Sequence, residues 1–347
     1  MLRPMLNILL ILAVISIVAA PTSAPAQQKA IQLVLASWEP PNSPSTVILE
    51  RFAKDLEAAF PGRVKTSLQF SGALGKPAAH YDLATSGSAD ISFVAPSFTP
   101  GRFPVTDLLI LPIRLPSAKI ATSAIWYLQE KGYLNKEYAD VKVLWLSGSP
   151  PYQIQSAKKP IKSLSDFRGL KVRAAGQMGK AVEAMGGVAV AMPMTDVYTS
   201  LQRGVVDVTV NSFDTIAIFK LNEVTTSVTE FNLACLPMVY VMNKDAFAKL
   251  PADIQAFLEQ TKTKYSEAIA DYTDGRAAKG LEIVKNEGKA AHRFETTDLD
   301  KMPRLFAPIW ADYIKQFESK GFPVKAASDD LGSFLGSKFG IKNPILR

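Results

Sequence analysis

The sequence predicts an α/β protein built from two lobes. Its 347 residues exceed the ~100 to 200 residues of a single domain, which favours two packed units. From residue 31 onward, strand-like and helix-like segments alternate, as they do in α/β folds. Residues 148–151 (Gly-Ser-Pro-Pro) interrupt this alternation, and a second alternating set follows them. Two such sets on either side of one break predict two lobes of the same class.

The overall composition is that of a packed globular protein. Hydrophobic residues make up 48% and charged residues 20% of the chain. The formal charge of +7 comes from 39 Lys and Arg against 32 Asp and Glu, but the densest basic pair is only Lys158 and Lys159. Because no basic stripe or nucleic-acid reading motif is present, we expect no nucleic-acid partner.

The first 26 residues have the pattern of a secretory signal peptide. Arg3 precedes an apolar run over 8–20, and an A-x-A cleavage pattern occupies 24–26. The run is shorter than the ~18 to 20 residues of a membrane span, so an uncleaved anchor is the less favoured alternative. Cys235 is the single cysteine, which excludes an internal disulfide, and no cysteine follows the cleavage site as in a lipoprotein. We expect a periplasmic protein, cleaved near Ala26.

The first set of elements follows from hydrophobic periodicity. Apolar residues at i, i+3 and i+4 mark helices, with Ser45 expected to cap the first of them, and alternation from Val64 marks a strand with one wetter face. The predicted strands are 31–36, 64–70, 90–94 and 141–146, and the predicted helices are 45–60, 77–85 and 118–129.

The second set repeats the same pattern with shorter elements. In such folds, ligands bind beyond the C-terminal ends of the strands, where the loops gather. Residues that directly follow strands are therefore the candidates for function. The predicted strands are 170–173, 188–191 and 205–210, and the predicted helices are 179–185 and 196–203.

The longest helical pattern runs over 251–289. Its apolar stripe shifts by one position at Asp274 and Gly275. Two interpretations are open: one long helix that bends or breaks at this glycine and contacts both lobes, or two ordinary helices joined by a turn there.

Catalytic and metal-binding motifs are absent from the sequence. His80 and His292 are the only histidines and belong to no Cys/His or H-E-x-x-H cluster. No nucleophile elbow, phosphate loop or dinucleotide fingerprint occurs either. We therefore expect no catalytic residue, no metal and no cofactor. A secreted α/β hydrolase with an unusual set of residues is the alternative from a different class.

Two polar residues close predicted strands of the second set. Arg173 ends the strand at 170–173, and Asn211 follows the strand at 205–210. A guanidinium group matches a carboxylate with two parallel hydrogen bonds, and an amide can donate a third. These residues are therefore candidates for holding an acid, although an arginine in this position is more often a surface ion-pair residue.

Several segments resemble one family in both content and order. They are S-G-A-L-G at 71–75, G-L-K-V-R at 169–173, and D-V-Y-T-S-L-Q-R-G-V-V-D at 196–207, with V-M-N-K at 241–244 and L-P-A-D-I-Q at 250–255. The chain is similar over about 31–287 to the solute-binding proteins of tripartite ATP-independent periplasmic (TRAP) transporters. An ABC-type solute-binding protein is the nearest alternative, because it shares the two-lobed plan.

The resemblance implies a periplasmic binding protein fold with crossing hinge strands and a long helix spanning both lobes. It implies a lobe I of 27–150 plus about 237–275, and a lobe II of 151–236 plus about 276–347. Arg173 would grip the carboxylate of an organic acid, Asn211 would assist, and Met194 would form an apolar wall. The expected partners are this small-molecule ligand and the membrane permease subunits, and the protein is expected to act as a monomer without enzymatic activity.

The chain departs from the family pattern where many members carry a second arginine, because Gln153 stands there beside Tyr152. Ala95 or Pro96 stands where a glutamate is frequent. A site with one arginine and few other charges suits an aromatic or hydrophobic monocarboxylate. The predicted ligand-binding residues are Arg173, Asn211, Trp38, Gln153, Tyr152, Met194, Phe213, Met238 and Phe98, some of which would pack the lobes without touching ligand.

Overall fold

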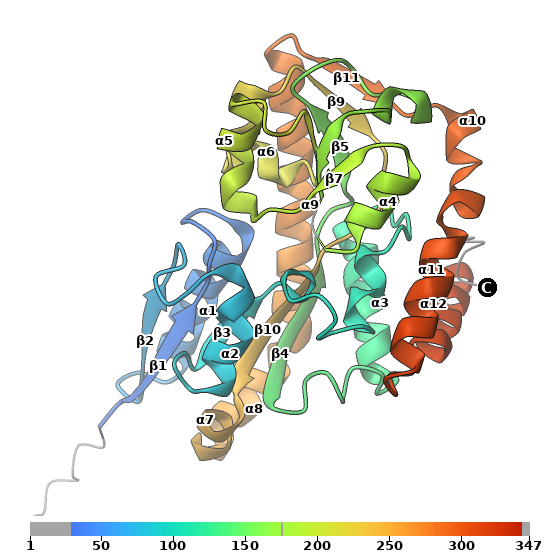
Figure 1. The fold of residues 1–347 in the computed structure, drawn as a ribbon. Helices are drawn as coiled ribbons and strands as arrows, with labels where there is room; N and C mark the ends of the chain where they lie inside the picture. Colours follow the sequence, from blue (N-terminus) through green and yellow to red (C-terminus); the bar gives the residue numbers. More distant parts are fainter. Residues whose placement is uncertain (1–28, 175, 342–347) are drawn as a thin grey trace, which may run out of the picture.

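Two separate β-sheets, each with its own helices, form two lobes (Figure 1). The computed structural model describes residues 29–174 and 176–341, so the predicted signal peptide lies outside the described residues. Within these ranges, none of the helices combines the length and apolar character that crossing a membrane requires. The two-lobed α/β fold predicted from the alternating pattern is confirmed.

Lobe I is built on a five-stranded sheet of order β2-β1-β3-β10-β4. Strand β1 is parallel to β2 and β3, whereas β10 runs antiparallel to both β3 and β4. The strands are β1 (Ile31–Ala36), β2 (Val64–Gln69), β3 (Ile91–Val94), β4 (Val141–Gly148) and β10 (Pro237–Asn243). The helices are α1 (Pro44–Ala59), α2 (His80–Thr85), α3 (Ala118–Glu130), α7 (Lys244–Lys249) and α8 (Ala252–Gln260), with 3-10 helices at Pro77–Ala79, Pro96–Phe98 and Thr106–Ile110.

Lobe II is built on a six-stranded sheet of order β11-β9-β5-β8-β6-β7. Strand β6 is parallel to β7 and β8, and β5 is antiparallel to β8 and β9. The strands are β5 (Gln153–Ser156), β6 (Lys171–Arg173), β7 (Val188–Val190), β8 (Val208–Asn211), β9 (Ser227–Glu230) and β11 (Ala290–Arg293). The helices are α4 (Met178–Ala184), α5 (Val197–Gln202) and α6 (Asp214–Ile218), with 3-10 helices at Leu164–Phe167, Met194–Asp196 and Leu221–Val224.

The two sheets are joined by a pair of crossing segments that form the predicted hinge. Residues 149–152 carry the chain from β4 to β5, and residues 231–236 carry it back from β9 to β10. Backbone hydrogen bonds join the two segments, from Ser149 N to Leu236 O (2.8 Å) and from Tyr152 N to Ala234 O (2.7 Å). These bonds lie between the sheets and not within either of them, as expected for a hinge between two lobes.

Helix α9 (Lys262–Asn286) spans both lobes and continues without a break through Asp274 and Gly275 (Figure 1). Of the two interpretations, the single long helix that contacts both lobes is confirmed, and it has no break at these two residues (Figure 1). The interruption lies earlier, at Thr261, which separates α8 from α9. The apparent phase shift arose because the expected stripe ran through Tyr272, whereas the buried residue is its neighbour Thr273.

The buried face of α9 contacts lobe I with its first half and lobe II with its second half. Tyr265 and Ile269 pack in the core of lobe I, while Val284 belongs to a small cluster with Phe213 of lobe II. The Asp274 carboxylate accepts hydrogen bonds from the backbone N–H groups of Ala118 (2.9 Å) and Lys119 (3.3 Å) at the start of α3. One helix thus braces both lobes.

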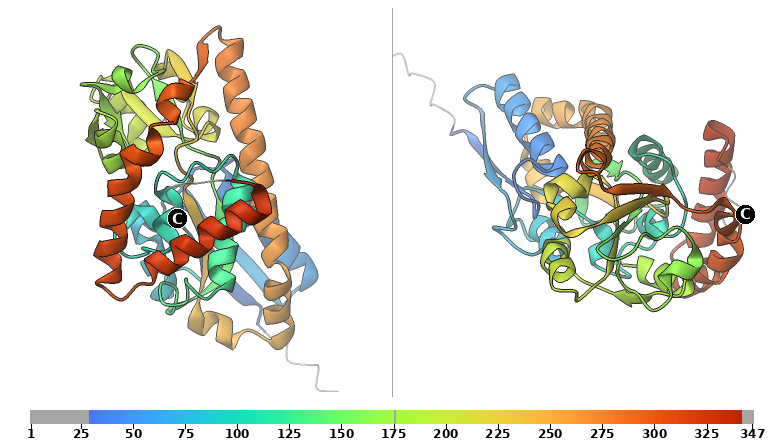
Figure 2. Two further views of the ribbon diagram at one scale, coloured as in Figure 1. Left: turned by 90° about the vertical axis from the view of Figure 1, so that its right-hand side faces the viewer. Right: turned by 90° about the horizontal axis from the view of Figure 1, so that it is seen from above.

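After β11, the chain returns to lobe I through α10 (Thr296–Leu299), α11 (Met302–Glu318) and α12 (Val324–Phe339). Helices α11 and α12 meet at a wide angle, and α12 crosses α3 (Figure 2). Tyr133 donates a hydrogen bond to Asp330 (2.8 Å), and Tyr313 donates one to Pro104 O (2.8 Å), so the C-terminal helices are fixed to lobe I. The lobe boundaries drawn from the resemblance place these helices, within about 276–347, in lobe II, which differs from these contacts.

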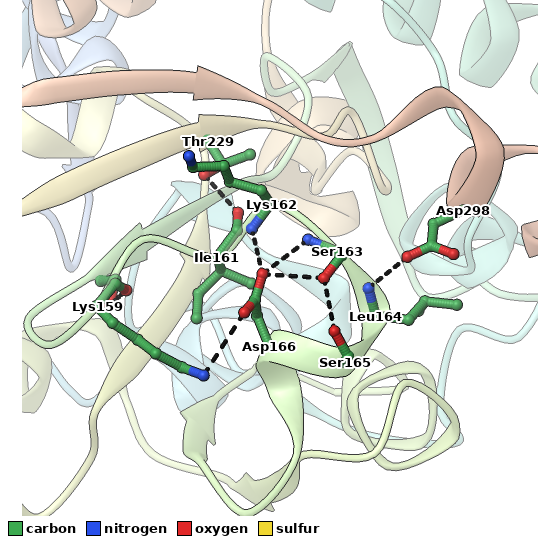
Figure 3. A network of polar contacts seen from close by, with 10 residues as sticks. Lys159, Ile161, Lys162, Ser163, Leu164, Ser165, Asp166, Thr229 and Asp298 are labelled. Carbon is green, nitrogen blue, oxygen red and sulfur yellow. Dashed lines mark hydrogen bonds and ion pairs between the residues drawn. The ribbon is translucent and has the colours of Figure 1, made fainter.

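The loop that leads into β6 is held by a network of polar contacts (Figure 3). The Asp166 carboxylate accepts hydrogen bonds from the N–H groups of Lys162 and Ser163 and from the Ser163 hydroxyl, each at 3.0 Å. Asp298 accepts a further bond from Leu164 N (2.7 Å). These contacts fix the start of the segment that ends in Arg173, because β6 begins five residues after Asp166.

Candidate functional site

A small cavity lies between the two lobes, at the ends of their strands. The space that can hold the centre of a water molecule measures about 40 Å³, enough for only a few waters. Its lining residues come from both sheets and from the hinge: Trp38, Glu39, Pro44, Phe98, Ser149, Tyr152, Arg173, Met194, Asn211, Ser212, Asp214, Thr215, Phe219, Leu236 and Met238.

The strand directions explain why these residues meet. Strands β1 and β3 end at Ala36 and Val94, so Trp38 and Phe98 follow at one edge of the lobe I sheet. Because β10 runs antiparallel, its start at Met238 lies at the same edge. In lobe II, the parallel strands β6 and β8 end at Arg173 and Asn211. The carboxyl-terminal edge of each sheet therefore faces the cavity, as expected for ligand sites in α/β folds.

Arg173 is the buried cation of this cavity. Only 1% of the residue is exposed, and its Nε and Nη2 atoms donate to Met192 O at 3.3 and 3.1 Å. None of the ion pairs formed within residues 29–174 and 176–341 includes this guanidinium. Burial lowers the pKa of Arg173, since it disfavours the charged form. A buried charge without a counterion costs folding free energy that an anionic ligand would offset.

The aromatic wall of the cavity is built around Trp38. Its ring stacks on Phe93 with centroids 5.6 Å apart and meets Phe98 edge-on at 5.5 Å. The Pro-rich loop after β1 supports this arrangement because proline restricts the backbone. The indole Nε1 of Trp38 has no hydrogen-bond partner in the part of the chain that the structure describes. Trp38 therefore offers the cavity an apolar face and an unpaired donor.

Asn211 and Met194 contact each other beside the cavity. The Asn211 amide donates to the Met194 sulfur at 2.8 Å, and both side chains are buried. A thioether is a weak acceptor, so this amide retains the capacity for a stronger hydrogen bond. Of the nine residues predicted from the sequence, the cavity wall contains these two together with Arg173, Trp38, Tyr152, Met238 and Phe98.

Gln153 and Phe213 do not belong to the cavity wall. The Gln153 side chain turns to the other hinge segment, where its Oε1 accepts from Asn232 N (2.9 Å) and its Nε2 donates to Asn232 Oδ1 (2.6 Å). Phe213 packs with Val228 and Val284 in the cluster between lobe II and α9. Position at a strand end places both residues near the cavity, but their side chains are held by packing elsewhere.

Two carboxylates line the cavity that the sequence reasoning did not single out. Glu39 comes from the loop after β1 in lobe I, and Asp214 begins α6 in lobe II. The expectation of a cleft with one arginine and few other charges is thereby corrected. A usable signal was present in the sequence, since Glu39 directly follows Trp38 and Asp214 lies three residues after Asn211.

Glu39 is held by the first turn of α1. Its Oε2 accepts hydrogen bonds from Ser45 N (3.2 Å) and from the Ser45 hydroxyl (2.5 Å). Ser45 does not cap α1 as expected, because the helix already begins at Pro44, with Ser43 at the capping position. Burial, opposed by the Ser45 hydrogen bonds and assisted by the negative charge of Asp214, raises the pKa of Glu39 to about 7.

Asp214 is 6% exposed, and its Oδ1 has no hydrogen-bond partner among the described residues. Burial raises its pKa to about 6, although the Ser212 hydroxyl and the positive charge of Arg276 on α9 act in the opposite direction. Both carboxylates therefore take up protons more readily than in water. The cavity combines one cation, two acids that titrate near neutral pH, and aromatic walls.

The described residues contain no group of three or more His, Cys, Asp or Glu side chains that could hold a metal ion. His80 is buried in lobe I, where its Nδ1 contacts the Ser92 hydroxyl at 3.0 Å, and burial lowers its pKa to about 4. Cys235 is buried as well, and burial raises the pKa of its thiol. Neither residue lines the cavity.

Comparison with known proteins now places this arrangement in a family. The model of the bacterial extracellular solute-binding proteins, family 7, matches residues 35–316. The chain belongs to this family. Its members are the extracytoplasmic solute-binding proteins of TRAP transporters, which bind small molecules and work with membrane permease subunits. The family and the fold are those of transport proteins and not of enzymes, as the sequence indicated.

Two curated relatives illustrate the sequence similarity. A solute-binding protein of Verminephrobacter eiseniae is 27% identical over 295 residues, which cover 80% of this chain and 83% of that protein. The C4-dicarboxylate-binding periplasmic protein of Rhodobacter capsulatus is 30% identical over 186 residues, which cover 51% of this chain and 54% of that protein.

Solved structures share the whole architecture. A TRAP solute-binding protein from Desulfovibrio salexigens aligns with a TM-score of 0.80 at 28% identity, covering 89% of this chain and 97% of that one. A marine metagenome TRAP protein specific for aromatic acid ligands aligns with a TM-score of 0.81 at 25% identity, covering 88% and 99%. A Bordetella bronchiseptica protein with bound mandelate aligns with a TM-score of 0.79 at 26% identity, covering 88% and 97%.

Proposed function

We propose that this TRAP solute-binding protein captures an organic monocarboxylate with an aromatic or hydrophobic body and delivers it to a membrane permease. The observation that carries the proposal is Arg173, a guanidinium that is 1% exposed and lacks an ion-pair partner within the described residues, in a cavity with aromatic walls. The ligand carboxylate would take the place of that partner. Asn211 would donate a further hydrogen bond.

The walls of the cavity favour an apolar ligand body. Trp38, Phe98 and Tyr152 bring three aromatic rings to the cavity, and Met194 and Met238 add soft side chains that adapt to different shapes. The marine metagenome protein and the Bordetella bronchiseptica protein, which bind aromatic acids and mandelate, are at least 25% identical to this chain and support the same class. Closure of the lobes about the hinge would desolvate the pair between the acid and Arg173.

Calorimetry on two arginine variants tests the proposal. Removing one partner of a buried ion pair costs about 3 to 5 kcal/mol, so Arg173→Ala should weaken binding of a cognate acid by ~10² or more. Arg173→Lys keeps the charge but loses the planar fork, and should give an intermediate loss. Arg203→Ala, at an exposed arginine of the same lobe, is the matched control and should bind normally. A loss of less than tenfold for Arg173→Ala rejects the clamp.

We further propose that residues 1–26 direct the chain to the periplasm and are removed there, and that the protein acts as a monomer. The positive n-region, the short apolar run and the A-x-A pattern support the first point. N-terminal sequencing of the exported protein checks the cleavage site, and light scattering checks the monomer. A mature protein that begins far from residue 27, or a stable dimer, contradicts these assignments.

A further inference from the structure

The strongest unexplained feature of the cavity is the unpaired acceptor of Asp214. Buried polar atoms in folded proteins nearly always have a hydrogen-bond partner. Asp214 is 6% exposed and lines the cavity, yet its Oδ1 accepts no hydrogen bond from residues 29–174 or 176–341. An acceptor in this position is suited to a donor group that a bound ligand brings.

Glu39 supplies a second acceptor from the opposite lobe. Its carboxylate lines the same cavity and is oriented by Ser45, which donates to Oε2 through both its N–H and its hydroxyl. Glu39 and Asp214 lie near enough that the charge of Asp214 raises the pKa of Glu39. A ligand group between them would contact lobe I and lobe II at once.

This pair of carboxylates is separate from the arginine that would hold the ligand carboxylate. Tyr152 directly precedes β5, and β8 separates β5 from β6 and its Arg173 in the lobe II sheet. Arg173 ends β6, whereas Asp214 begins α6 and Glu39 follows β1 in the opposite lobe. A ligand that spans the cavity from Arg173 to the two acids would contact both lobes.

We propose that Glu39 and Asp214 form a second polar subsite that accepts a hydrogen bond from a hydroxyl group on the bound acid, at a distance from its carboxylate. This inference rests on the proposed function, and it narrows the ligand class to hydroxy-substituted monocarboxylates. The hydroxyl donates to Oδ1 of Asp214, and Glu39 closes over it from lobe I. Such a subsite discriminates strongly between a hydroxy acid and the same acid without the hydroxyl, because the latter leaves a buried acceptor unpaired.

The charges around the subsite favour a neutral hydroxyl over an ammonium group or a second carboxylate. The positive charge of Arg276 on α9 lowers the pKa of both acids and offsets part of their attraction for a further cation. A second ligand carboxylate would be repelled by Glu39 and Asp214 themselves. A hydroxyl carries no charge and hydrogen-bonds to a carboxyl group in either protonation state.

The test compares acids that differ only in a hydroxyl group. Calorimetry at pH 7 on the unaltered protein uses benzoate against 3- and 4-hydroxybenzoate, phenylacetate against its ring-hydroxylated forms, hexanoate against 6-hydroxyhexanoate, and 3-(aminomethyl)benzoate as the ammonium probe. We expect at least one hydroxy acid to bind about tenfold or more tightly than its parent, and the ammonium probe to bind more weakly than that hydroxy acid.

Asp214→Asn then identifies the acceptor. The amide keeps the shape of the carboxylate but should turn its oxygen to the Ser212 hydroxyl and the Thr215 N–H, which places a donor where Oδ1 stood. The preference for the hydroxyl should fall below about threefold. Asp196→Asn, which removes the same charge from an exposed position of lobe II, should change neither value.

The possible outcomes separate the two proposals. If parent acids bind but no hydroxyl raises the affinity, or if the preference survives in Asp214→Asn, the subsite is overturned while the proposed function stands. A preference for the ammonium probe overturns the hydroxyl assignment. If no acid of the set binds the unaltered protein, the proposed function fails and the subsite fails with it. Urea unfolding shows whether Asp214→Asn is folded, and the unaltered protein alone already decides the preference.

Discussion

Helix α9 approaches lobe II so closely at Gly280 that a single methyl group should separate them. A Cβ atom at this position would lie 2.9 Å from the carbonyl carbon of Phe213, nearer still to its oxygen, and 3.5 Å from Cβ of Ile216. Gly280→Ala therefore forces α9 and α6 apart, because a backbone carbonyl cannot rotate away as a side chain does. Gly275→Ala is the matched control, since the same atom at Gly275 meets nothing within 4 Å.

Both substitutions gain helix propensity, but only Gly280→Ala adds a steric clash. Alanine is favoured over glycine inside a helix by up to ~1 kcal/mol, so Gly275→Ala should raise the free energy of unfolding by about 0.5 to 1 kcal/mol. Gly280→Ala gains the same amount but pays about 1 to 3 kcal/mol or more for overpacking. The rigid backbone contact favours the upper part of that range. We expect the two variants to differ by about 2 to 4 kcal/mol.

Equilibrium urea unfolding of both variants measures this difference directly. Acid binding by calorimetry adds a second measurement, because displacing Phe213 also shifts its neighbour Asp214 in the cavity wall. Gly280→Ala should lose both stability and affinity, whereas Gly275→Ala should keep its affinity. If Gly280→Ala is as stable as Gly275→Ala, the close contact between α9 and α6 does not exist in solution and the reasoning is refuted.

Two further predictions concern buried polar groups outside the cavity wall. Burial, opposed by hydrogen bonds from the Thr106 side chain and backbone, raises the pKa of Glu137 to about 8 from 4.5. The folded state therefore binds more protons than the unfolded state between these pH values, and the free energy of unfolding falls as pH rises through this window. Glu137→Gln should remove about 2 kcal/mol of the loss in stability between pH 6 and 8. Urea unfolding measures this loss, and an equal dependence of stability on pH in the variant and the unaltered protein would contradict the prediction. Gln153→Leu leaves the N–H groups of Phe231 and Asn232 without their acceptor and should lower the free energy of unfolding by about 2 to 4 kcal/mol. Gln153→Glu keeps an acceptor and should lower it less. A similar loss of stability for both variants in the same assay would show that this side chain does not hold the two hinge segments together.

Most elements of the fold were predictable because each lobe buries its own strands. The strand predicted at 31–36 agrees with β1, and the helix predicted at 118–129 agrees with α3 to within one residue. Boundaries were least predictable where apolar residues occupy an exposed turn. The strand predicted at 205–210 begins only at Val208 in β8, and Val205 is 49% exposed. Apolar character alone did not distinguish the turn from the strand.

The course of α9 was not predictable from periodicity, because its buried face includes a polar residue. Thr273 is buried, and its hydroxyl donates to the backbone oxygen of Ile269 at 2.9 Å, so no hydrogen bond is lost inside the helix. A pattern that counts only apolar residues assigns the position to Tyr272 and produces a break where none exists. The packing of Asp274 against the start of α3 likewise depends on the tertiary arrangement.

The cavity was predictable in part, for a reason that lies in sheet geometry. Strand direction fixes which edge a residue reaches, and this located Arg173, Asn211 and Trp38. Strand direction does not fix where a side chain turns, and Gln153 and Phe213 are held by the hinge and by α9 instead. The candidate ligand contacts themselves stay a proposal until an acid is bound.

Glu39 and Asp214 escaped sequence reasoning because their proximity exists only when the lobes meet. They lie 175 positions apart and share no motif. Helix α9 also affects both acids. Arg276 lowers the pKa of Glu39 and of Asp214. Gly280, four residues later, lies against the backbone of Phe213, the residue before Asp214. A change in α9 that never touches the cavity should therefore alter both the position and the protonation of its acidic end. The helix that braces the lobes should in this way influence the candidate site without lining it.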